Sequence, residues 1–339
     1  MKSLTHQLAA FVAFCATACA GAKVYAADFY QGKTLTIIVG FSSGGGYDMT
    51  ARLYSRHYGR HLPGNPQIVV SNMPGAGSVV AATNLYGAQP QDGTRLGIVA
   101  GGAVIEPLLG VQAKYDARKF QWIGGRSVEP SICAIWHESP VKTMQDAMTS
   151  EVIVGASGPG SRTLTYPKLL NELIGTKFKV VTGYPGSNEI RLAMERKEVG
   201  GQCGLAWGTA KTRLPDWLTE RKLTLLTQFG LTPASDLPDV PLAAQFAKNE
   251  RDRKAIEFLE SDAILAWPLF APPATPQERM ADLRQGFSAM LRDPELLADA
   301  QKQGLDVEEV SGATLQKVIE DLYATPNDVL EVVKRSMAE

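Results

Sequence analysis

The sequence predicts an α/β fold that is divided into two lobes. Short apolar runs of strand length alternate with amphipathic stretches of helix length, which is the pattern of sheets covered by helices. The chain has 339 residues, more than a single hydrophobic core usually organises. Hydrophobic residues make up 45% of the chain, so two lobes can both be well packed.

The apolar runs and the turn-forming residues between them predict the order of the helices and strands. Helices are expected from Met49, after Gly77, and over 163–173, 187–196 and 210–219. Residues 233–241 read as a turn-rich connection, and 276–337 as amphipathic helices interrupted by Pro294, Gly304 and Pro326. The expected strands are 35–41, 68–70, 96–100, 132–136, 152–156, 178–181, 223–226 and 263–270.

Residues 1–26 read as a cleavable signal peptide. Lys2 precedes an apolar run over 8–22 that ends before Ala26, and this run is about half the length of a membrane-spanning helix. A membrane anchor is the alternative, and Cys19 leaves lipoprotein processing open. We expect export to the periplasm and a soluble mature chain, because no later stretch has the roughly 20 uncharged apolar residues of a transmembrane helix.

Charge and cysteine content exclude several classes of function. The signal segment holds two lysines and no acid, so the mature chain has 34 − 2 = 32 basic and 35 acidic residues, a net charge of −3. Nucleic-acid binding is not expected, since that needs a concentrated basic face. Cys133 and Cys203 lack the Cys-x-x-Cys spacing, so neither a metal nor a cofactor is expected, and both a disulfide and buried free thiols remain open.

Two histidines have the i, i+4 spacing that metal ligands can adopt on a helix. His57 and His61 share one helix face, but no Glu follows His57 to make the zinc-protease pattern. We expect a solvated helix face that they share with Arg52, Arg56 and Arg60.

Three segments rich in Gly and Ser lie where an expected strand ends and an expected helix begins: 41–48, 155–162 and 183–187. Glycines let the backbone approach a ligand, and the first amides of a helix, together with its dipole, favour an anion. One such loop from each lobe would form a cleft rich in amides and hydroxyls. For the first loop alone, a flexible turn is the alternative, and Asp48 is expected to cap the helix.

Catalysis is not expected. Residues 155–159 come close to the Gly-x-Ser-x-Gly elbow, but Pro159 replaces the last glycine. A serine hydrolase of that type needs a histidine after its serine, and none follows Ser157.

Five motifs, 45–52, 72–77, 92–94, 237–241 and 269–276, occur in an order and spacing that resemble the receptors of tripartite tricarboxylate transporters, the TctC-type or Bug receptors. The resemblance implies a type II periplasmic binding protein fold with two crossing strands, near 124–131 and 225–230. Lobe one would comprise 27–126 plus 229–339, and lobe two 127–228. It also implies a solute in the cleft between the lobes, and a large and a small membrane subunit as transporter partners.

The resemblance further implies that amides, small hydroxyls and water hold a solute carboxylate, with no obligatory arginine. Ser42 and Ser43 stand where a Pro-Pro pair is usual, and 197–204 lacks two usual acids, which argues against an amino-acid ligand. Tyr184 and Trp207 form an aromatic wall or, alternatively, only pack the lobe. The expected ligand-binding residues are Ser42, Ser43, Gly44, Tyr47, Gly102, Ala103, Ser157, Ser161, Tyr184, Gly186 and Trp207.

Together these features predict a monomeric receptor, not an enzyme, for a small carboxylate, either an aromatic acid or a short dicarboxylate. A periplasmic protein that presents the bound carboxylate to a membrane sensor kinase would use the same fold and cleft, and it is the alternative.

Overall fold

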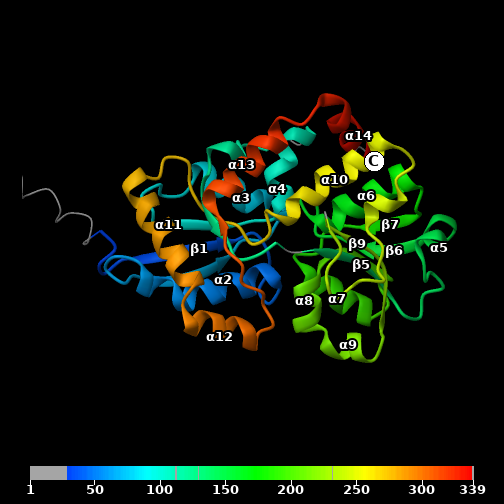
Figure 1. Ribbon diagram of the computed structural model, residues 1–339, viewed down its shortest axis with the longest axis horizontal. Coiled ribbons are helices and arrows are strands. Elements are labelled where there is room, and N and C mark those ends of the chain that lie inside the picture. The colour runs from blue at the N-terminus through cyan, green and yellow to red at the C-terminus, as the bar shows by residue number, and fades with distance from the viewer. Residues whose placement is uncertain (1–28, 111–112, 129, 231, 338–339) are drawn as a thin grey trace, which may run out of the picture.

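Two sheets, each covered by helices, form two lobes that lie side by side (Figure 1). The structure, a computed structural model, describes residues 29–110, 113–128, 130–230 and 232–337. The expected signal peptide, residues 1–26, lies outside the described residues. Within the described part of the chain, none of the helices combines the length and the apolar character needed to cross a bilayer.

The first lobe is built on a six-stranded sheet with the strand order β11-β4-β10-β3-β1-β2. β1 pairs in parallel with β2 and β3, whereas β10 runs antiparallel between β3 and β4. One hydrophobic core cluster contains Leu35, Ile37 and Val39 of β1, and another contains Ile38. Both faces of this strand are therefore covered. The strands are β1 (Thr34–Val39), β2 (Gln67–Asn72), β3 (Arg95–Ile98), β4 (Gln121–Gly125), β10 (Leu269–Ala271) and β11 (Val310–Ser311).

Helices cover this sheet on both sides, with α11 and α13 packed on β4 and α2 packed on β1 and β2. They are α2 (Gly46–His57), α3 (Val79–Gly87), α4 (Gly101–Ile105), α11 (Gln277–Leu291), α12 (Pro294–Lys302) and α13 (Gly312–Tyr323), with short 3-10 turns at Gly59–His61, Ala76–Ser78, Glu106–Leu109 and Ala117–Lys119.

The second lobe is built on a five-stranded sheet with the order β7-β6-β8-β5-β9. Cys133 of β5 lies opposite Cys203 of β8 in an antiparallel pair, and the two are joined in a disulfide, which answers the question that the sequence left open. The elements are β5 (Ser131–Trp136), α5 (Met144–Thr149), β6 (Val152–Gly155), α6 (Arg162–Ile174), β7 (Phe178–Val181), α7 (Ser187–Glu195), β8 (Gly201–Ala206), α8 (Trp207–Arg213), α9 (Pro215–Thr219) and β9 (Leu223–Phe229).

The chain passes between the lobes after β4, and β5 then starts the second sheet. After β9 it stays near that sheet: Gln228 forms a bridge with Leu242, and the 3-10 turn Ala243–Phe246 packs on β9. It next forms α10 (Glu250–Glu260) and the turn Ser261–Ala263 before it reaches β10.

The last helix, α14 (Asn327–Met337), packs on α6 and α10 (Figure 1). α14 also packs on the 3-10 turn Glu106–Leu109 of the first lobe, so it contacts both lobes. The division of the chain into 27–126 plus 229–339 and 127–228 stays a prediction.

The predicted α/β class is confirmed, and the differences are local. The expected strand 263–270 is wrong over most of its length, because only Leu269–Ala271 pairs with neighbouring strands and Trp267 has a positive φ of 58°. The glycine-rich strand β8 was not predicted, since Gly201 and Gly204 weaken its strand signal.

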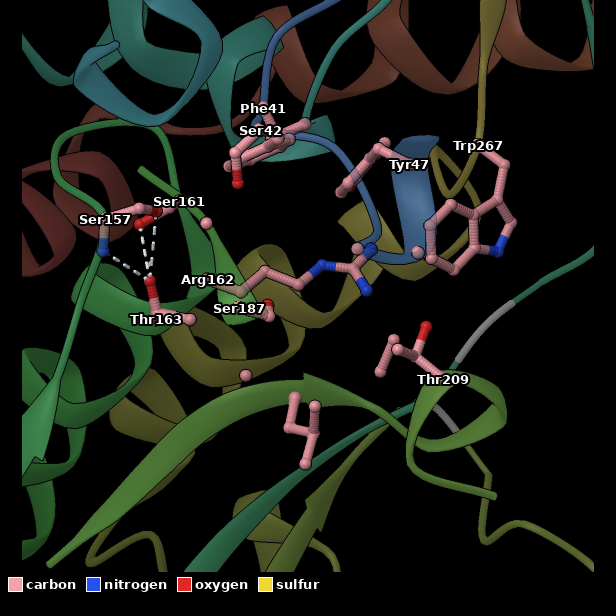
Figure 2. A pocket seen from close by; sticks show the side chains of 17 residues that line it. Phe41, Ser42, Tyr47, Ser157, Ser161, Arg162, Thr163, Ser187, Thr209 and Trp267 are labelled. Atoms are coloured by element: carbon pink, nitrogen blue, oxygen red, sulfur yellow. Dashed lines mark hydrogen bonds between the residues drawn. The ribbon is translucent and has the colours of Figure 1, made fainter. Parts of the chain in front are cut away.

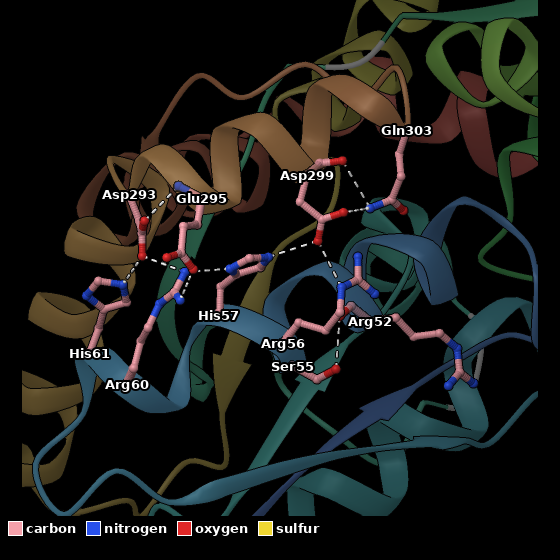
Figure 3. A network of polar contacts seen from close by, with 10 residues as sticks. All are labelled: Arg52, Ser55, Arg56, His57, Arg60, His61, Asp293, Glu295, Asp299 and Gln303. Atoms are coloured by element: carbon pink, nitrogen blue, oxygen red, sulfur yellow. Dashed lines mark hydrogen bonds and ion pairs between the residues drawn. The ribbon is translucent and has the colours of Figure 1, made fainter.

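A polar network holds α2 against α12 (Figure 3). His57 Nε2 lies 2.9 Å from Asp299 Oδ2, and His61 Nε2 lies 2.8 Å from Asp293 Oδ2. His57 is buried, so the expected solvated face is wrong for this residue: the face is a contact between helices. Among the residues described, no cluster of His, Cys, Asp and Glu has the arrangement of a metal site.

Candidate ligand-binding cleft

A cavity lies between the two lobes, at the ends of the strands that precede α2, α6 and α7. About 60 Å³ of it is accessible to the centres of water molecules. One water needs roughly 10–15 Å³ on that measure, so the cavity admits several waters or a small organic molecule. The first lobe contributes Phe41, Ser42, Gly45, Gly46, Tyr47, Ala100 and Trp267, and the second contributes Ser157, Ser161, Arg162, Thr163, Gly186, Ser187, Gly204, Leu205, Ala206 and Thr209.

Three helices begin at this cavity: α2 after Gly45, α6 after Ser161 and α7 after Gly186. None of these three residues caps its helix with a side-chain hydrogen bond. The first amides of the helices and the positive ends of their dipoles therefore lie at the cavity, where they favour an anion.

The β6–α6 loop and the first turn of α6 contribute a cluster of hydroxyl groups (Figure 2). Thr163 Oγ1 lies 2.8 Å from Ser161 Oγ and accepts a hydrogen bond of 3.0 Å from the Ser157 amide. Ser161 Oγ also donates to the Gly158 carbonyl at 2.7 Å. These bonds fix the loop and hold its hydroxyls in a defined arrangement at the cavity.

Arg162 is the one charged side chain among the described residues that line the cavity. It is only 7% exposed, and its Nη1 donates to Ser131 Oγ at 3.0 Å. Figure 2 shows its side chain extended through the site, with the guanidinium directed toward Tyr47 and Trp267. Sequence reasoning missed Arg162, because the resemblance implied no arginine, although the residue directly follows the predicted Ser161 at the start of a helix.

Aromatic side chains of the first lobe form the opposite wall (Figure 2). Tyr47 stacks on Phe41 at a centroid distance of 4.8 Å and lies at the same distance from Trp267. The Arg126 guanidinium lies 4.7 Å from the centroid of the Trp267 ring. The backbone of Trp267 has a positive φ, which is unfavourable for a bulky residue. Strained backbone conformations of this kind cluster at functional sites.

The two lobes touch around the cavity, so the structure is that of a closed cleft. Ser42 Oγ donates to Glu189 Oε2 at 2.9 Å, and Asn188 Nδ2 donates to the Ser43 carbonyl at 2.9 Å. The backbones also approach closely, since a Cβ at Gly102 would lie 2.3 Å from the Gly160 carbonyl oxygen. Closure thus brings both walls within reach of one small solute.

The model of the tripartite tricarboxylate transporter family receptor matches residues 60–334. The chain belongs to this receptor family. A curated relative of this receptor is the UPF0065 protein in the TAR-I ttuE-ttuC' intergenic region of Agrobacterium vitis. The two are 27% identical over 283 residues, which cover 79% of the receptor and 74% of the relative.

Solved structures share the receptor's fold. The periplasmic binding protein BugD aligns with a TM-score of 0.72 and 19% identity, covering 91% of the receptor and 99% of BugD. MatC from Rhodopseudomonas palustris, solved with bound malate, aligns with a TM-score of 0.71 and 22% identity, covering 89% of the receptor and 99% of MatC. The two-lobed periplasmic binding protein fold expected from the sequence is therefore confirmed.

The structure brings five of the predicted site residues together at the cavity: Ser42, Tyr47, Ser157, Ser161 and Gly186.

The other six predicted residues lie outside the lining. A Cβ at Gly44 would lie 2.4 Å from Asn188, whose Nδ2 contacts the Ser43 carbonyl, and Gly102 and Ala103 approach the Gly160 loop across the cleft. Trp207 Nε1 donates to Asp236 at 2.9 Å, and Tyr184 packs against the core of the second lobe. The aromatic wall of the cavity therefore comes from Phe41, Tyr47 and Trp267.

Asp48 lies in the first turn of α2 and accepts hydrogen bonds from the Gly44 amide and Arg52 Nε, both at 2.8 Å. Burial opposes ionisation, but these bonds and one from Asn72 prevail and lower the pKa of Asp48. It therefore braces the β1–α2 loop rather than lining the cavity.

Proposed function

We propose that the protein is a periplasmic receptor that captures a small carboxylate-bearing solute and delivers it to a tripartite tricarboxylate-type membrane transporter. The observation that carries this proposal is the cavity itself. Three helices without side-chain caps begin there, Arg162 lines it, and no acidic side chain belongs to its described lining. A lining with a cation, helix N-termini and no acidic side chain suits an anion.

The donors are sufficient to hold a carboxylate. A hydrogen bond to a charged group contributes roughly 1.5–3 kcal/mol, so a few converging amides and hydroxyls account for micromolar binding. In a closed cleft these dipoles act with little competing water. The malate bound to MatC, a protein with the same fold, supports a small carboxylate as the class of solute.

The fold also supplies the motion that a carrier needs. Solute contacts both lobes, so binding favours the closed arrangement, and opening at the connections between the lobes releases it. In this proposal the exported, monomeric protein performs no chemistry on its solute, and its partners are the large and small membrane subunits of the transporter.

Isothermal titration calorimetry tests the proposal. Protein stripped of solute by unfolding and refolding is titrated at pH 7 with succinate, malate, adipate and benzoate, and separately with amino acids and sugars. We expect one carboxylate per protein to bind and sugars to give no heat. Binding of sugars or amino acids alone contradicts the proposal.

A further inference from the structure

A second recess between the lobes lies where α8 and α12 end (Figure 1). Met49 and residues 301–304 of the first lobe line one side of it, and residues 211–213 of the second lobe line the other. We call this recess the α8–α12 groove. About 520 Å³ of it is accessible to the centres of water molecules, far more than in the solute cavity. The two share no lining residue, so the groove is a separate feature of the surface.

The charged side chains that line the α8–α12 groove are all cations. They are Lys211, Arg213 and Lys302, and no acidic residue belongs to the described lining. Lys211 pairs with Asp236 at 2.8 Å. Arg213 and Lys302 are exposed, and neither has an ion pair among the described residues. Because the whole chain has a net charge of −1, this concentration of cations is a local feature.

Helix stability explains these cations only one at a time. Lys211 and Arg213 lie in the last turn of α8, and Lys302 lies in the last turn of α12. A cation there interacts favourably with the helix dipole. The dipole gives no reason for cations of two lobes to line the same recess without an acid between them.

The closed arrangement of the lobes builds the groove. A Cβ at Gly304 would lie 2.6 Å from Thr212 Cγ2, so α8 approaches the end of α12 closely. Arg213 Nε also donates to Met49 Sδ at 2.8 Å, across the boundary between the lobes. Opening of the lobes would separate these pairs and move Arg213 away from Lys302.

We propose that the α8–α12 groove is a docking site for an acidic segment of the membrane transporter, a segment with at least two closely spaced carboxylates. This inference rests on the proposed function and specifies the chemistry by which the partner recognises the receptor. Carboxylates complement the exposed guanidinium of Arg213 and the ammonium of Lys302, and such complementarity steers association and fixes its register.

The position of the groove couples docking to the solute. Because both lobes contribute cations, the groove is complete only when the cleft is closed. The partner therefore prefers the solute-loaded receptor. By linkage, the solute and the partner strengthen each other's binding by the same factor.

A protein segment suits the groove better than an anionic membrane does. The groove is a recess that Asp and Glu side chains of a partner can enter, whereas lipid headgroups present a broad surface. The net charge of −1 also gives the whole chain no attraction to such a surface.

The test is an NMR titration of isotope-labelled protein with the peptide acetyl-Gly-Asp-Glu-Asp-Glu-Gly-amide. Shift changes are expected at residues 211–213 and 301–304, and the neutral peptide acetyl-Gly-Asn-Gln-Asn-Gln-Gly-amide should cause none. The double variant Arg213→Gln, Lys302→Gln should bind the acidic peptide about fivefold or more weakly, as loss of two exposed ion pairs predicts. Lys302→Gln alone should weaken it about twofold or more.

The matched control is the double variant Lys119→Gln, Lys179→Gln. It also removes one exposed cation from each lobe and gives the same net charge as the groove variant. Its affinity for the acidic peptide should stay within about twofold of the wild type, because distant exposed charges are screened by salt. Both double variants replace exposed side chains without ion pairs to carboxylates of the described chain, so their melting temperatures should match.

The solute provides a second comparison. An acid that binds the wild type in calorimetry is added to saturation, and the peptide titration is repeated. The acidic peptide should then bind about threefold or more tightly, and the peptide should tighten the acid by the same factor.

Three outcomes overturn the inference: no shift changes in the groove, equal weakening in both double variants, or a peptide affinity that the acid does not change. Binding to phosphatidylglycerol vesicles that only the groove variant loses, without peptide binding, also overturns it, because the occupant is then a membrane. Each of these leaves the proposed function standing, since the acid still binds in the cleft. Failure of the wild type to bind any acid contradicts the proposed function instead, and the comparison of variants in protein as purified still decides whether the groove binds the peptide.

Discussion

The Glu106 carboxylate of the first lobe accepts a hydrogen bond from the backbone N–H of Gly160 in the second lobe, across the closed cleft. Glu106 is 3% exposed, and its Oε2 has no hydrogen-bond partner among the described residues. Burial raises the pKa of Glu106 above its ordinary value of 4.5, against the opposing effect of the Gly160 bond. In the closed cleft this carboxyl group is therefore buried and has a raised pKa.

Glu106→Gln should change how solute affinity depends on pH. Because the pKa of Glu106 is raised in the closed state, this residue favours closure at pH values below its ordinary pKa. Its contribution to closure is lost as the pH rises through the raised pKa. The ratio of the affinity of Glu106→Gln to that of the wild type should therefore increase with pH, by up to about tenfold between pH 5 and 8. Calorimetry across this pH range measures both affinities. Titration of the solute itself affects both proteins equally, so it does not change the ratio. A ratio that stays constant contradicts the assigned role.

Gly102→Ala should prevent full closure. The new Cβ would lie 2.3 Å from the Gly160 carbonyl oxygen, so the loop must move away. We expect affinity to fall about tenfold, while the ligand-free protein keeps its melting temperature, since alanine is the better helix former by about 1 kcal/mol. The matched control is Gly87→Ala in α3, where a Cβ meets nothing within 4 Å. Equal affinities for the two variants would show that the glycine approach is not needed.

Replacing the disulfide should affect stability and not binding. Cys133 and Cys203 are separated by 70 residues, and linking them restricts the unfolded chain. The double variant Cys133→Ala, Cys203→Ala should unfold with about 2–4 kcal/mol less free energy. Neither residue lines the cavity, so solute affinity should stay the same. Urea unfolding of the wild type with and without reductant checks this, and identical midpoints would contradict it.

Asp299→Asn should destabilise the packing of α2 on α12. Burial opposes ionisation of Asp299, but hydrogen bonds from His57 and Arg56 prevail and lower its pKa from 3.8 to about 2. A depressed pKa gives stability that is present above pH 3.8 and is lost as the pH falls through about 2. After allowance for solvent screening, the loss at pH 7 should be about 1 kcal/mol. Thermal unfolding at pH 7 and pH 3 should show a smaller difference at the lower pH.

The fold class was accessible from the sequence because buried parallel strands appear as short apolar runs between amphipathic helices. The loops were accessible because Gly and Ser follow those runs. Strand β8 could not be predicted from the sequence, since glycine carries little strand signal. Arg162 was missed because the resemblance implied neutral hydrogen-bond donors and no arginine. Trp267 was missed because it lies far in sequence from the other wall residues and reaches the cavity through a backbone turn that no local pattern signals.

The central claim is that the closed cleft selects a small carboxylate, and competitive capture tests it most directly. Stripped protein is incubated with a mixed extract of small metabolites, washed, and unfolded, and the released solute is identified by mass spectrometry. We predict that one organic acid, enriched over its level in the extract, is released from wild-type protein and much less from Gly102→Ala. Enrichment of a solute without a carboxylate, or equal recovery from both proteins, would contradict the account.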